Sequence, residues 1–198
     1  MLPPFVKEFF RNPSEVGSLI PSSRELTNAV VKPIDFGTAR CIVEYGPGTG
    51  VFTDALIRRR RPETVLLLVE LNERFCVLLK QRYAGQPNVH VVHGSADKTA
   101  DYLLAARAPS VDYVVCSLPF RSMPLRLNWR ILEHTRNVLL PEGKLILFQY
   151  SLQNTKLFER LFQLVEQQHV LLNFPPAHVL VYKPSSGSQP ETAASADA

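Results

Sequence analysis

Residues 43–50 read Val-Glu-Tyr-Gly-Pro-Gly-Thr-Gly, and the fold that we expect for the chain follows from this stretch. Apolar residues precede it, as in a short strand, and residues 51–60 continue with a pattern that favours a helix. Glycines directly after a first strand let the backbone turn tightly and approach a ligand where a Cβ would stand in the way. The stretch therefore predicts a strand, a ligand-binding turn and a helix in immediate succession.

Segments that favour strands and helices continue to alternate after the glycine turn. The continuous apolar run at 64–71 is typical of a strand buried on both faces. The alternation predicts an α/β fold with a parallel, doubly wound Rossmann-like sheet, preceded by an N-terminal amphipathic helical extension. The predicted strands are 41–46, 64–71, 88–94, 111–120, 144–151 and 177–183, and the predicted helices are 24–31, 51–60, 72–83, 98–107, 128–140 and 155–168.

The chain divides into three parts by composition. Its 198 residues fit one domain with a full core, which we place at residues 36–183. Residues 1–35 read as helices broken by turns, and residues 184–198 lack apolar content, which predicts a disordered tail. No apolar run approaches the ~20 residues needed to span a bilayer, and charges interrupt the N-terminal apolar residues. We therefore expect a cytoplasmic protein without a secretory signal.

The net charge indicates which kind of partner the chain could bind, and the cysteines indicate whether it has a metal site. The formal net charge of +4 suggests an anionic partner, which nucleic acid, an anionic membrane surface or a phosphorylated small molecule would satisfy. The cysteines, Cys41, Cys76 and Cys116, lie far apart among apolar neighbours. We expect them in the core and predict no metal site.

The glycine turn has an acidic partner at the end of the next strand. In a doubly wound sheet, the carboxylate of Glu70 lies beside the turn and can accept both ribose hydroxyls of an adenosine. The glycine spacing differs from the dinucleotide fingerprint G-x-G-x-x-G. With Glu44 it resembles motif I, E-x-G-x-G-x-G, of Rossmann-like methyltransferases that bind S-adenosylmethionine (SAM), although a glycine turn without a ligand is the alternative. The resemblance implies SAM as cofactor and S-adenosylhomocysteine (SAH) as product, bound by Glu44, Gly46, Gly48, Gly50, Glu70 and Leu71.

The third predicted strand ends in Gly94-Ser95-Ala96. Many methyltransferases of this type have Gly-Asp-Ala here, and the aspartate accepts the adenine amino group. We therefore predict that Ser95 and Ala96 contact the cofactor, with Ser95 as the weaker acceptor, unless Asp97 reaches in instead.

The fourth predicted strand ends in Cys-Ser-Leu-Pro-Phe at residues 116–120. In amino-directed methyltransferases, loop carbonyls at this strand end accept N–H bonds from the target amine, and an aromatic ring holds it. A ring face attracts a cation by ~0.5–2 kcal/mol. This resemblance implies catalytic roles for Ser117, Leu118 and Phe120, with Ser117 also touching the cofactor; the alternative is a plain loop with a buried phenylalanine.

Two methyltransferase families share this layout. The ribosomal RNA adenine dimethylases usually have Asn or Asp in place of Ser117, and they carry a C-terminal helical RNA-binding domain that we do not expect here. The sequence more closely resembles the bacterial phospholipid N-methyltransferases, over nearly its whole folded length. The matching segments are EFFRNPSEVGSLIPSSREL, VEYGPGTGVFTDAL, CSLPFRSMP, LFQYS and NFPPAHVLVY.

The second resemblance implies an enzyme that methylates the amine of phosphatidylethanolamine in steps to phosphatidylcholine. It implies a peripheral protein on the inner face of the cell membrane, with a phospholipid substrate and neither nucleic acid nor metal as partner. Related enzymes methylate ornithine lipids, so that this headgroup is an alternative. An RNA adenine methyltransferase and a non-catalytic membrane-binding protein with the same fold are the competing hypotheses.

The amine must be positioned and must lose a proton, since a free amine has a pKa near ~10. Tyr150 is the residue that we expect to contact the amine and guide its proton, and His178 is a second candidate. Donors for the lipid phosphate are expected in the N-terminal segment, although each could equally be a helix cap or a solvated charge. They are Arg11, Ser22, Ser23 and Arg24.

Residues 5–11 have the pattern of a short amphipathic helix. Phe5, Val6, Phe9 and Phe10 share one helical face, and basic residues recur on another. Such a helix can lie in the headgroup region of an anionic membrane or pack on its own sheet. Because a lipid substrate requires a membrane contact, we expect this segment to be a lid and a membrane contact.

Overall fold

The computed structural model describes residues 23–108, 110–152 and 155–185 of the chain. The expectations for the amphipathic helix at residues 5–11, for Arg11 and Ser22, and for most of the C-terminal tail lie outside these described residues. The strands are β1 (Cys41–Tyr45), β2 (Val65–Glu70), β3 (Val89–His93), β4 (Val111–Cys116), β5 (Leu139–Gln149), β6 (Phe162–Val170) and β7 (Ala177–Pro184). The helices are α2 (Arg24–Val31), α3 (Val51–Arg59), α4 (Glu73–Arg82), the 3₁₀ turn η1 (Ala96–Lys98), α5 (Thr99–Ala105), α6 (Leu125–Val138) and α7 (Thr155–Glu159).

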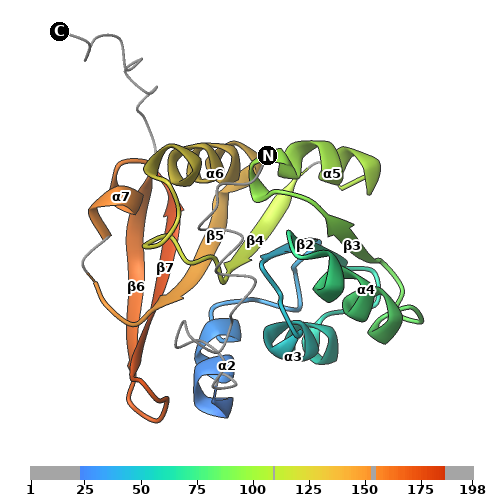
Figure 1. Cartoon of the computed structure of the whole chain (residues 1–198), viewed down its shortest axis with the longest axis horizontal. Helices are drawn as coiled ribbons and strands as arrows, with labels where there is room; N and C mark the ends of the chain where they lie inside the picture. The colour runs from blue at the N-terminus through green and yellow to red at the C-terminus, as the bar shows by residue number, and fades with distance from the viewer. Residues whose placement is uncertain (1–22, 109, 153–154, 186–198) are drawn as a thin grey trace, which may run out of the picture.

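The strands form a seven-stranded sheet in the order β3-β2-β1-β4-β5-β7-β6 (Figure 1). Strands β1 to β5 pair in parallel, which confirms the predicted α/β sheet. Strand β7 runs antiparallel to both β5 and β6. The carboxyl ends of β4 and β5 therefore share one edge of the sheet with the end of β6 and the start of β7.

The prediction of a single helix over residues 155–168 is wrong. Helix α7 ends at Glu159, and strand β6 begins at Phe162. Strand β6 is the edge strand, and only its first and last residues are buried, so its sequence lacks the regular alternation of a half-buried strand. Pairing with β7 supplies the backbone partners that fix the strand. Residues 141–143, Pro-Glu-Gly, separate the helix predicted at 128–140 from the strand predicted at 144–151, but they lie within strand β5.

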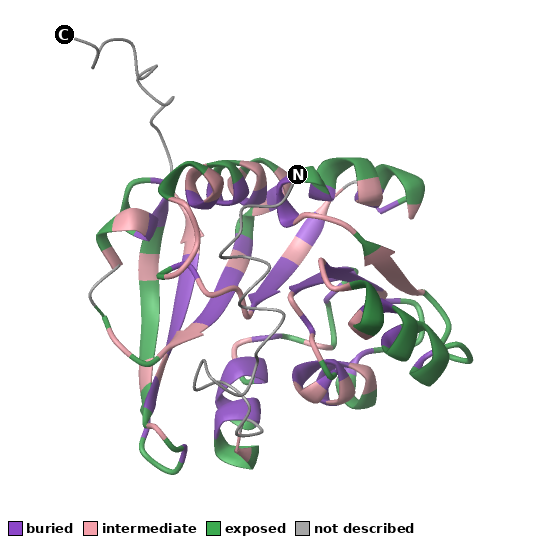
Figure 2. Cartoon of the chain, in the orientation of Figure 1, coloured by how far each residue is buried: buried purple, intermediate pink, exposed green. Residues whose placement is uncertain are grey.

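Alternate residues of each central strand enter two hydrophobic clusters, one on each face of the sheet. Ile42 packs with residues of α2, α3 and α4, whereas Val43 packs with residues of α5, α6 and α7. Figure 2 shows the buried residues concentrated in the central strands and in the helix faces that cover them. Burial on both faces explains why these strands read as continuous apolar runs.

The three cysteines lie in this core, as predicted. All three are free and buried. Burial raises the pKa of the Cys41 and Cys116 thiols to about 12 and that of Cys76 to about 11. They are therefore protonated and poorly nucleophilic at neutral pH.

Helix α2 begins where the sequence predicts it. The side chain of Ser23 accepts a hydrogen bond from the backbone N–H of Leu26 at 3.0 Å, which makes Ser23 the N-cap. The backbone N–H of Ser23 itself donates to Oδ1 of Asn173, in the β6–β7 loop, at 3.0 Å. The start of α2 is thus tied to the β6–β7 hairpin at the carboxyl edge of the sheet.

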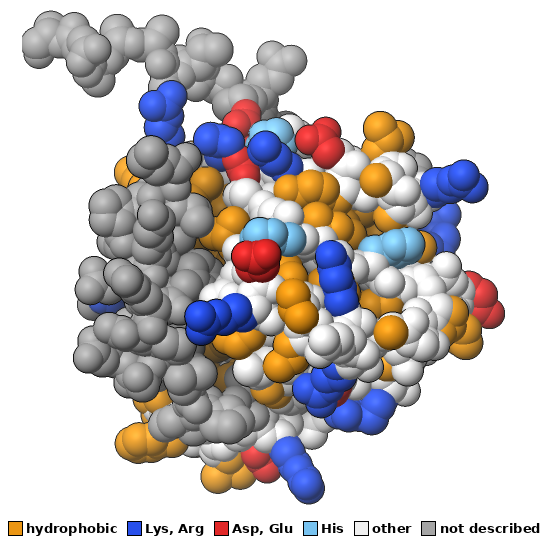
Figure 3. All heavy atoms as spheres, turned by 45° about the vertical axis from the view of Figure 1, so that its right-hand side comes forward, with side chains coloured by type: hydrophobic (Ala, Val, Ile, Leu, Met, Phe, Trp, Pro, Cys, Tyr) orange, Lys and Arg blue, Asp and Glu red, His pale blue; other side chains and the backbone are white. Residues whose placement is uncertain are grey.

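The surface carries more basic than acidic side chains, in line with the net charge of +4. On the face drawn in Figure 3, the lysine and arginine side chains are spread among apolar and neutral groups and do not form one continuous stripe. Within the described part of the chain, no helix is both long and apolar enough to cross a bilayer.

Candidate active site

The glycine turn joins β1 to α3, and each of its three glycines has a positive φ. The values are 66° for Gly46, 56° for Gly48 and 89° for Gly50, a region that favours glycine. A Cβ on Gly46 would lie 3.2 Å from the side chain of Leu118, and one on Gly50 would lie 2.5 Å from the hydroxyl of Tyr83. A Cβ on Gly48 would meet no atom within 4 Å. The turn is therefore packed at both ends and open at its centre, as a ligand cradle requires.

Glu70, at the end of β2, holds this turn. Its carboxylate is 2% exposed, and one oxygen accepts the backbone N–H of Gly48 at 2.9 Å. The other oxygen accepts the backbone N–H of Asn72, also at 2.9 Å. Burial raises the pKa of Glu70, and these hydrogen bonds partly oppose the rise. Each oxygen keeps a lone pair, so the carboxylate can still accept from ligand hydroxyls.

Glu44, in β1, is fully buried beneath the turn. One oxygen of its carboxylate accepts the hydroxyl of Thr53, in α3, at 2.7 Å, and the other has no hydrogen-bond partner. Burial raises the pKa of Glu44 to about 8, and the negative charge of Glu70 adds to the rise. A buried carboxylate with a free oxygen fits a cationic ligand, because a nearby cation would favour its ionised form. The open cradle at Gly48 and this free oxygen together fit SAM.

The end of β3 lies beside the same turn. The backbone N–H of Gly94 donates to the carbonyl of Glu70 at 2.9 Å, which places Ser95 and the buried Ala96 next to the end of β2. The ring of His93 contacts the carbonyl of Leu71 at 3.1 Å. The predicted cofactor residues of β2 and β3 are therefore brought together.

The carboxylate of Asp97, the alternative to Ser95, is engaged by another side chain. Its buried carboxylate forms an ion pair with Arg130 of α6. This pairing satisfies the charge of Asp97 inside the fold and leaves Ser95 as the candidate for the adenine amino group.

At the end of β4, Ser117 lies against the glycine turn. Its backbone N–H donates to the carbonyl of Tyr45 at 3.0 Å, and its hydroxyl oxygen is buried without a partner. The side chain of Leu118 packs against Gly46. Both predicted residues thus border the cofactor cradle, and the hydroxyl of Ser117 is available for a ligand.

Phe120 differs from the expectation of a free ring face at the strand end. Its side chain is 5% exposed and packs edge-on against Phe158 of α7, with ring centroids 5.2 Å apart. The side-chain amide of Asn128 donates to the carbonyl of Phe120 at 2.7 Å, which fixes the loop. The ring is therefore part of the hydrophobic core, because α7 packs over the end of β4.

Tyr150 follows β5 and is 42% exposed. Its ring contacts Phe148 edge-on at 5.8 Å between centroids, and Phe148 contacts Phe52, in the first turn of α3, at 5.5 Å. These contacts place Tyr150 on the face of the sheet that also carries the glycine turn. Burial raises the pKa of Tyr150, and a hydrogen bond with Asn173 partly opposes the rise, so the phenol is neutral at neutral pH.

His178, in β7, belongs to a polar row that the sequence revealed only in part. It pairs in register with Gln149 of β5 and with His169 of β6, whose ring stacks on it at 4.4 Å. Nδ1 of His178 and Oε1 of Gln149 are both buried without a partner. Burial lowers the pKa of His178, followed by the effect of His169. Gln149 lies in the segment LFQYS, and only the cross-strand register shows that it faces the same side as His178.

The predicted phosphate donors within the described residues have different environments. The hydroxyl of Ser23 caps α2, whereas Arg24 is exposed in the first turn of that helix. Among the described residues, no cluster of His, Cys, Asp or Glu side chains could hold a metal ion.

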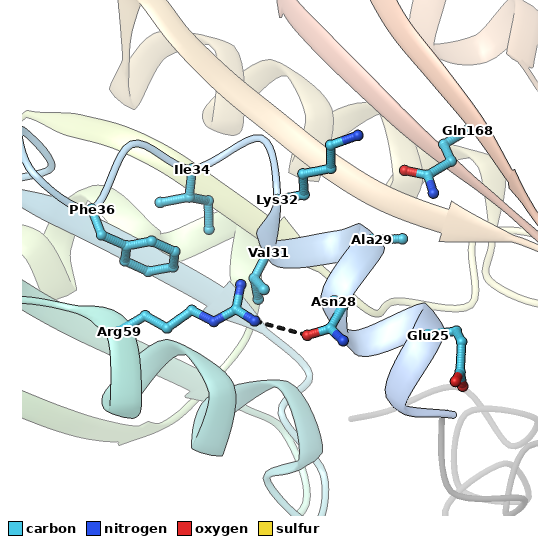
Figure 4. A pocket seen from close by; sticks show the side chains of 9 residues that line it. All are labelled: Glu25, Asn28, Ala29, Val31, Lys32, Ile34, Phe36, Arg59 and Gln168. Carbon is cyan, nitrogen blue, oxygen red and sulfur yellow. Dashed lines mark hydrogen bonds between the residues drawn. The ribbon is translucent and has the colours of Figure 1, made fainter.

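A surface depression of about 540 Å³ lies away from these residues, between α2, α3 and β6 (Figure 4). A hydrogen bond of 2.7 Å between Arg59 and Asn28 spans it. None of the predicted cofactor residues lines it, so we assign it no part in the site. Its lining is Glu25, Asn28, Ala29, Val31, Lys32, Ile34, Phe36, Arg59 and Gln168.

Comparisons with known proteins show the family to which the domain belongs. Residues 42–143 match a family model described as a methyltransferase domain. The chain is 32% identical over 139 residues to an ornithine lipid N-methyltransferase of Singulisphaera acidiphila, which covers 70% of this chain and 72% of that protein. It is 26% identical over 99 residues to a ribosomal RNA small subunit methyltransferase A of Dehalococcoides mccartyi, but this match covers only 32% of that protein.

Solved structures share the fold. The N-methyltransferase NodS of Bradyrhizobium japonicum, in complex with SAH, superimposes with a TM-score of 0.72 at 12% identity, covering 92% of this chain and 99% of NodS. TrmN of Thermus thermophilus superimposes with a TM-score of 0.67 at 18% identity, covering 89% of this chain and 52% of TrmN. The family match, the shared fold and a cradle that fits the cofactor lead to one conclusion. The chain belongs to the class I SAM-dependent methyltransferases.

Proposed function

We propose that the protein N-methylates the headgroup amine of a membrane lipid, with an ornithine lipid as the first candidate substrate. The observation that carries the proposal is the 32% identity to an ornithine lipid N-methyltransferase, which extends over 70% of this chain. Phosphatidylethanolamine, the substrate that the sequence resemblance favoured, becomes the second candidate.

The two headgroups differ in the anionic group beside the amine. An ornithine lipid presents an amine and a carboxylate, whereas phosphatidylethanolamine presents an amine and a phosphate. Of the predicted phosphate donors that the structure describes, Ser23 is engaged as a helix cap, which leaves Arg24. Both anions need such donors and Arg24 can bind either, so the order of the two candidates rests on the identity to the relative.

Glu44, Glu70 and the turn at Gly48 would hold SAM, with Leu71, Ser95 and Ala96 at its adenosine end. When bound, SAM supplies an electrophilic methyl group on its sulfonium. The free oxygen of Glu44 and the lone pairs of Glu70 provide the acceptors for its ammonium and its ribose hydroxyls. The residues of the chain therefore act by binding and orientation.

The amine that receives the methyl group is positioned by buried hydrogen-bond acceptors at the carboxyl ends of β4 and β5 and at the start of β7. The free atoms are the hydroxyl oxygen of Ser117, Oε1 of Gln149 and Nδ1 of His178. Each can accept an N–H bond from an amine. The lowered pKa of His178 keeps its imidazole neutral, so that it does not repel an ammonium headgroup.

Tyr150 has a different part in this proposal. Because burial raises the pKa of its phenol, the side chain is not a base at neutral pH. It orients the headgroup through its hydroxyl, and the proton of the ammonium leaves through water. Leu118 forms the wall between the two ligands, since it packs on Gly46.

A lipid substrate also requires contact with a bilayer. We propose a peripheral location on the inner face of the cell membrane, with the amphipathic segment at residues 5–11 on an anionic surface. Arg11 and Ser22 remain candidates for headgroup contacts in that segment.

The test is methyl transfer from radiolabelled SAM by the purified protein. Three acceptors are compared, namely vesicles with an ornithine lipid, vesicles with phosphatidylethanolamine, and ribosomal RNA. The proposal expects label in lipid, with the ornithine lipid above phosphatidylethanolamine. Label in RNA alone would reject it in favour of the activity that the relative from Dehalococcoides mccartyi is named for.

A further inference from the structure

The loop between β6 and β7 exposes three large apolar side chains at one edge of the sheet. We define residues 171–176 as the hairpin tip. Leu171 is 69% exposed, Leu172 is 75% exposed and Phe174 is 77% exposed. The sequence from residue 170 to residue 177 contains no charged residue. Figure 2 shows this loop as an exposed protrusion beside α2. Nothing in the cofactor chemistry requires such exposure.

The hairpin tip lies at the edge of the sheet that carries the free hydrogen-bond acceptors of the site. His178, two residues after the tip, pairs with Gln149 at the end of β5, because β7 runs antiparallel to β5. Burial raises the pKa of the Tyr150 phenol, and Asn173, within the tip, lies near enough to Tyr150 to oppose this rise. The exposed side chains therefore stand on the same side of the molecule as the free acceptors of the site.

The conformation of the tip is fixed by Asn173, which is only 6% exposed. Its side-chain amide donates to the carbonyl of Pro175 at 2.7 Å, and its Oδ1 accepts the backbone N–H of Ser23 at 3.0 Å. The polar residue points inward and its apolar neighbours point outward. The loop therefore holds these apolar side chains in exposed positions. Because its backbone is already ordered, moving the side chains out of water into an apolar environment costs little further conformational entropy.

We propose that the hairpin tip inserts into the lipid bilayer and holds the acceptor side of the site against the membrane surface. This proposal deepens the proposed function and rests on it for the identity of the substrate. The tip exposes three large apolar side chains, far fewer than the roughly 20–30 residues that each partner contributes to a stable protein interface. A patch of this size suits shallow insertion at a bilayer interface, which adds to the affinity of other membrane contacts. The exposed Arg24, next to Ser23, can face anionic headgroups beside it.

The test measures partitioning of the full chain onto vesicles of phosphatidylcholine and phosphatidylglycerol, neither of which carries a methylatable amine. Leu172→Ser should weaken partitioning about threefold, and the triple variant Leu171→Ser, Leu172→Ser, Phe174→Ser at least about tenfold. Leu104→Ser is the matched control, because Leu104 is 77% exposed but belongs to α5, away from the tip. It should leave partitioning unchanged.

Two further measurements keep the outcomes distinct. Methyl transfer to a short-chain amino lipid that is soluble as a monomer should be the same in the triple variant and the wild type. A Phe174→Trp variant should show a blue shift of its emission on addition of vesicles, measured against the wild type with its single Trp129.

Unchanged partitioning of the triple variant would overturn the membrane contact. A wild-type dimer that the triple substitution converts to a monomer, without any effect on partitioning, would overturn it in favour of a second copy of the chain. If no lipid accepts a methyl group but partitioning still depends on the tip, the membrane contact stands and the proposed function fails.

Discussion

The carboxylate of Glu70 accepts the backbone N–H of Gly48 at 2.9 Å, so the end of β2 holds the turn that follows β1. The second oxygen of Glu70 accepts the N–H of Asn72, at the start of α4. One buried side chain thereby joins the cradle, the neighbouring strand and a helix cap. The negative charge of the carboxylate can bind the ligand, and its two hydrogen bonds stabilise the fold.

Glu70→Gln separates these two roles. The glutamine amide can accept one of the two N–H bonds but presents an NH₂ group to the other, which costs about 1–2 kcal/mol of unfolding free energy. It also removes the charge that accepts ligand hydroxyls, so the Kd for SAH should rise by at least about tenfold. Calorimetric titration with SAH and urea denaturation measure the two effects. Glu73→Gln, at an exposed position of α4, should change neither.

Alanine at Gly48 and at Gly50 should have different consequences. Gly48→Ala adds only the strain of a positive φ, about 1–2 kcal/mol, yet its methyl group enters the open cradle, so the variant should fold and lose SAH binding. Gly50→Ala adds a clash with Tyr83 to a similar strain, so it should lose about 3 kcal/mol or more. Tyr83→Phe in the Gly50→Ala background should recover part of that loss. SAH binding by a folded Gly48→Ala protein at wild-type affinity would show that the cradle lies elsewhere.

Glu44 should make the stability of the ligand-free protein depend on pH. Its pKa rises from an ordinary 4.5 to about 8 in the folded state, so folding favours the protonated form. This contribution is fully present below pH 4.5 and is lost as pH rises toward 8. Between pH 5 and pH 8.5 the wild type should therefore lose about 1–3 kcal/mol relative to Glu44→Gln, measured by urea denaturation.

A control and a second readout accompany this prediction. Glu166→Gln, at an exposed position of β6, should follow the wild type over the same pH range. SAH binding near neutral pH should release a proton from the wild type but not from Glu44→Gln, because the ligand cation favours the ionised carboxylate. Parallel pH profiles of the wild type and Glu44→Gln would contradict the assignment.

Tyr150→Phe should lower kcat for the lipid acceptor by less than about tenfold and raise KM, because the hydroxyl orients the headgroup and does not take its proton. Since burial raises the pKa of Tyr150, the pH profile of kcat/KM between pH 6 and pH 9 should keep its shape. Steady-state kinetics with the short-chain amino lipid measure both. Tyr113→Phe, which removes a phenol outside the site, serves as the control. An unchanged kcat and KM would dismiss Tyr150 as an acceptor contact.

The parts of the fold that local sequence dictates could be predicted. Helix α2 runs over the expected residues 24–31, capped by one of the two serines that precede it, Ser23. Strands β1, β2 and β4 follow apolar runs, as burial on both faces requires. Strand β6 could not be predicted, because an edge strand with exposed polar side chains is defined by its pairing with β7. The same holds for the antiparallel direction of β7.

The site residues likewise fall into those that local sequence predicts and those that depend on tertiary packing. Gly46, Gly48, Gly50 and Glu70 lie together as the motif and the strand order predicted. The pairing of Asp97 with Arg130 and the burial of Phe120 by Phe158 depend on helices that pack from distant parts of the chain. The free atoms of Gln149 and His178 emerge only from the register between β5 and β7.

We expect the methyl acceptor to be a lipid amine, and a competition experiment distinguishes this acceptor from RNA. Ribosomal RNA and vesicles with equal amounts of an ornithine lipid and phosphatidylethanolamine are incubated together with labelled SAM and the purified protein, with Gly48→Ala as the inactive control. We expect label in the lipid fraction, more in the ornithine lipid than in phosphatidylethanolamine, and none with Gly48→Ala. Label confined to the RNA would show that the methyl acceptor is a nucleic acid and not a lipid amine.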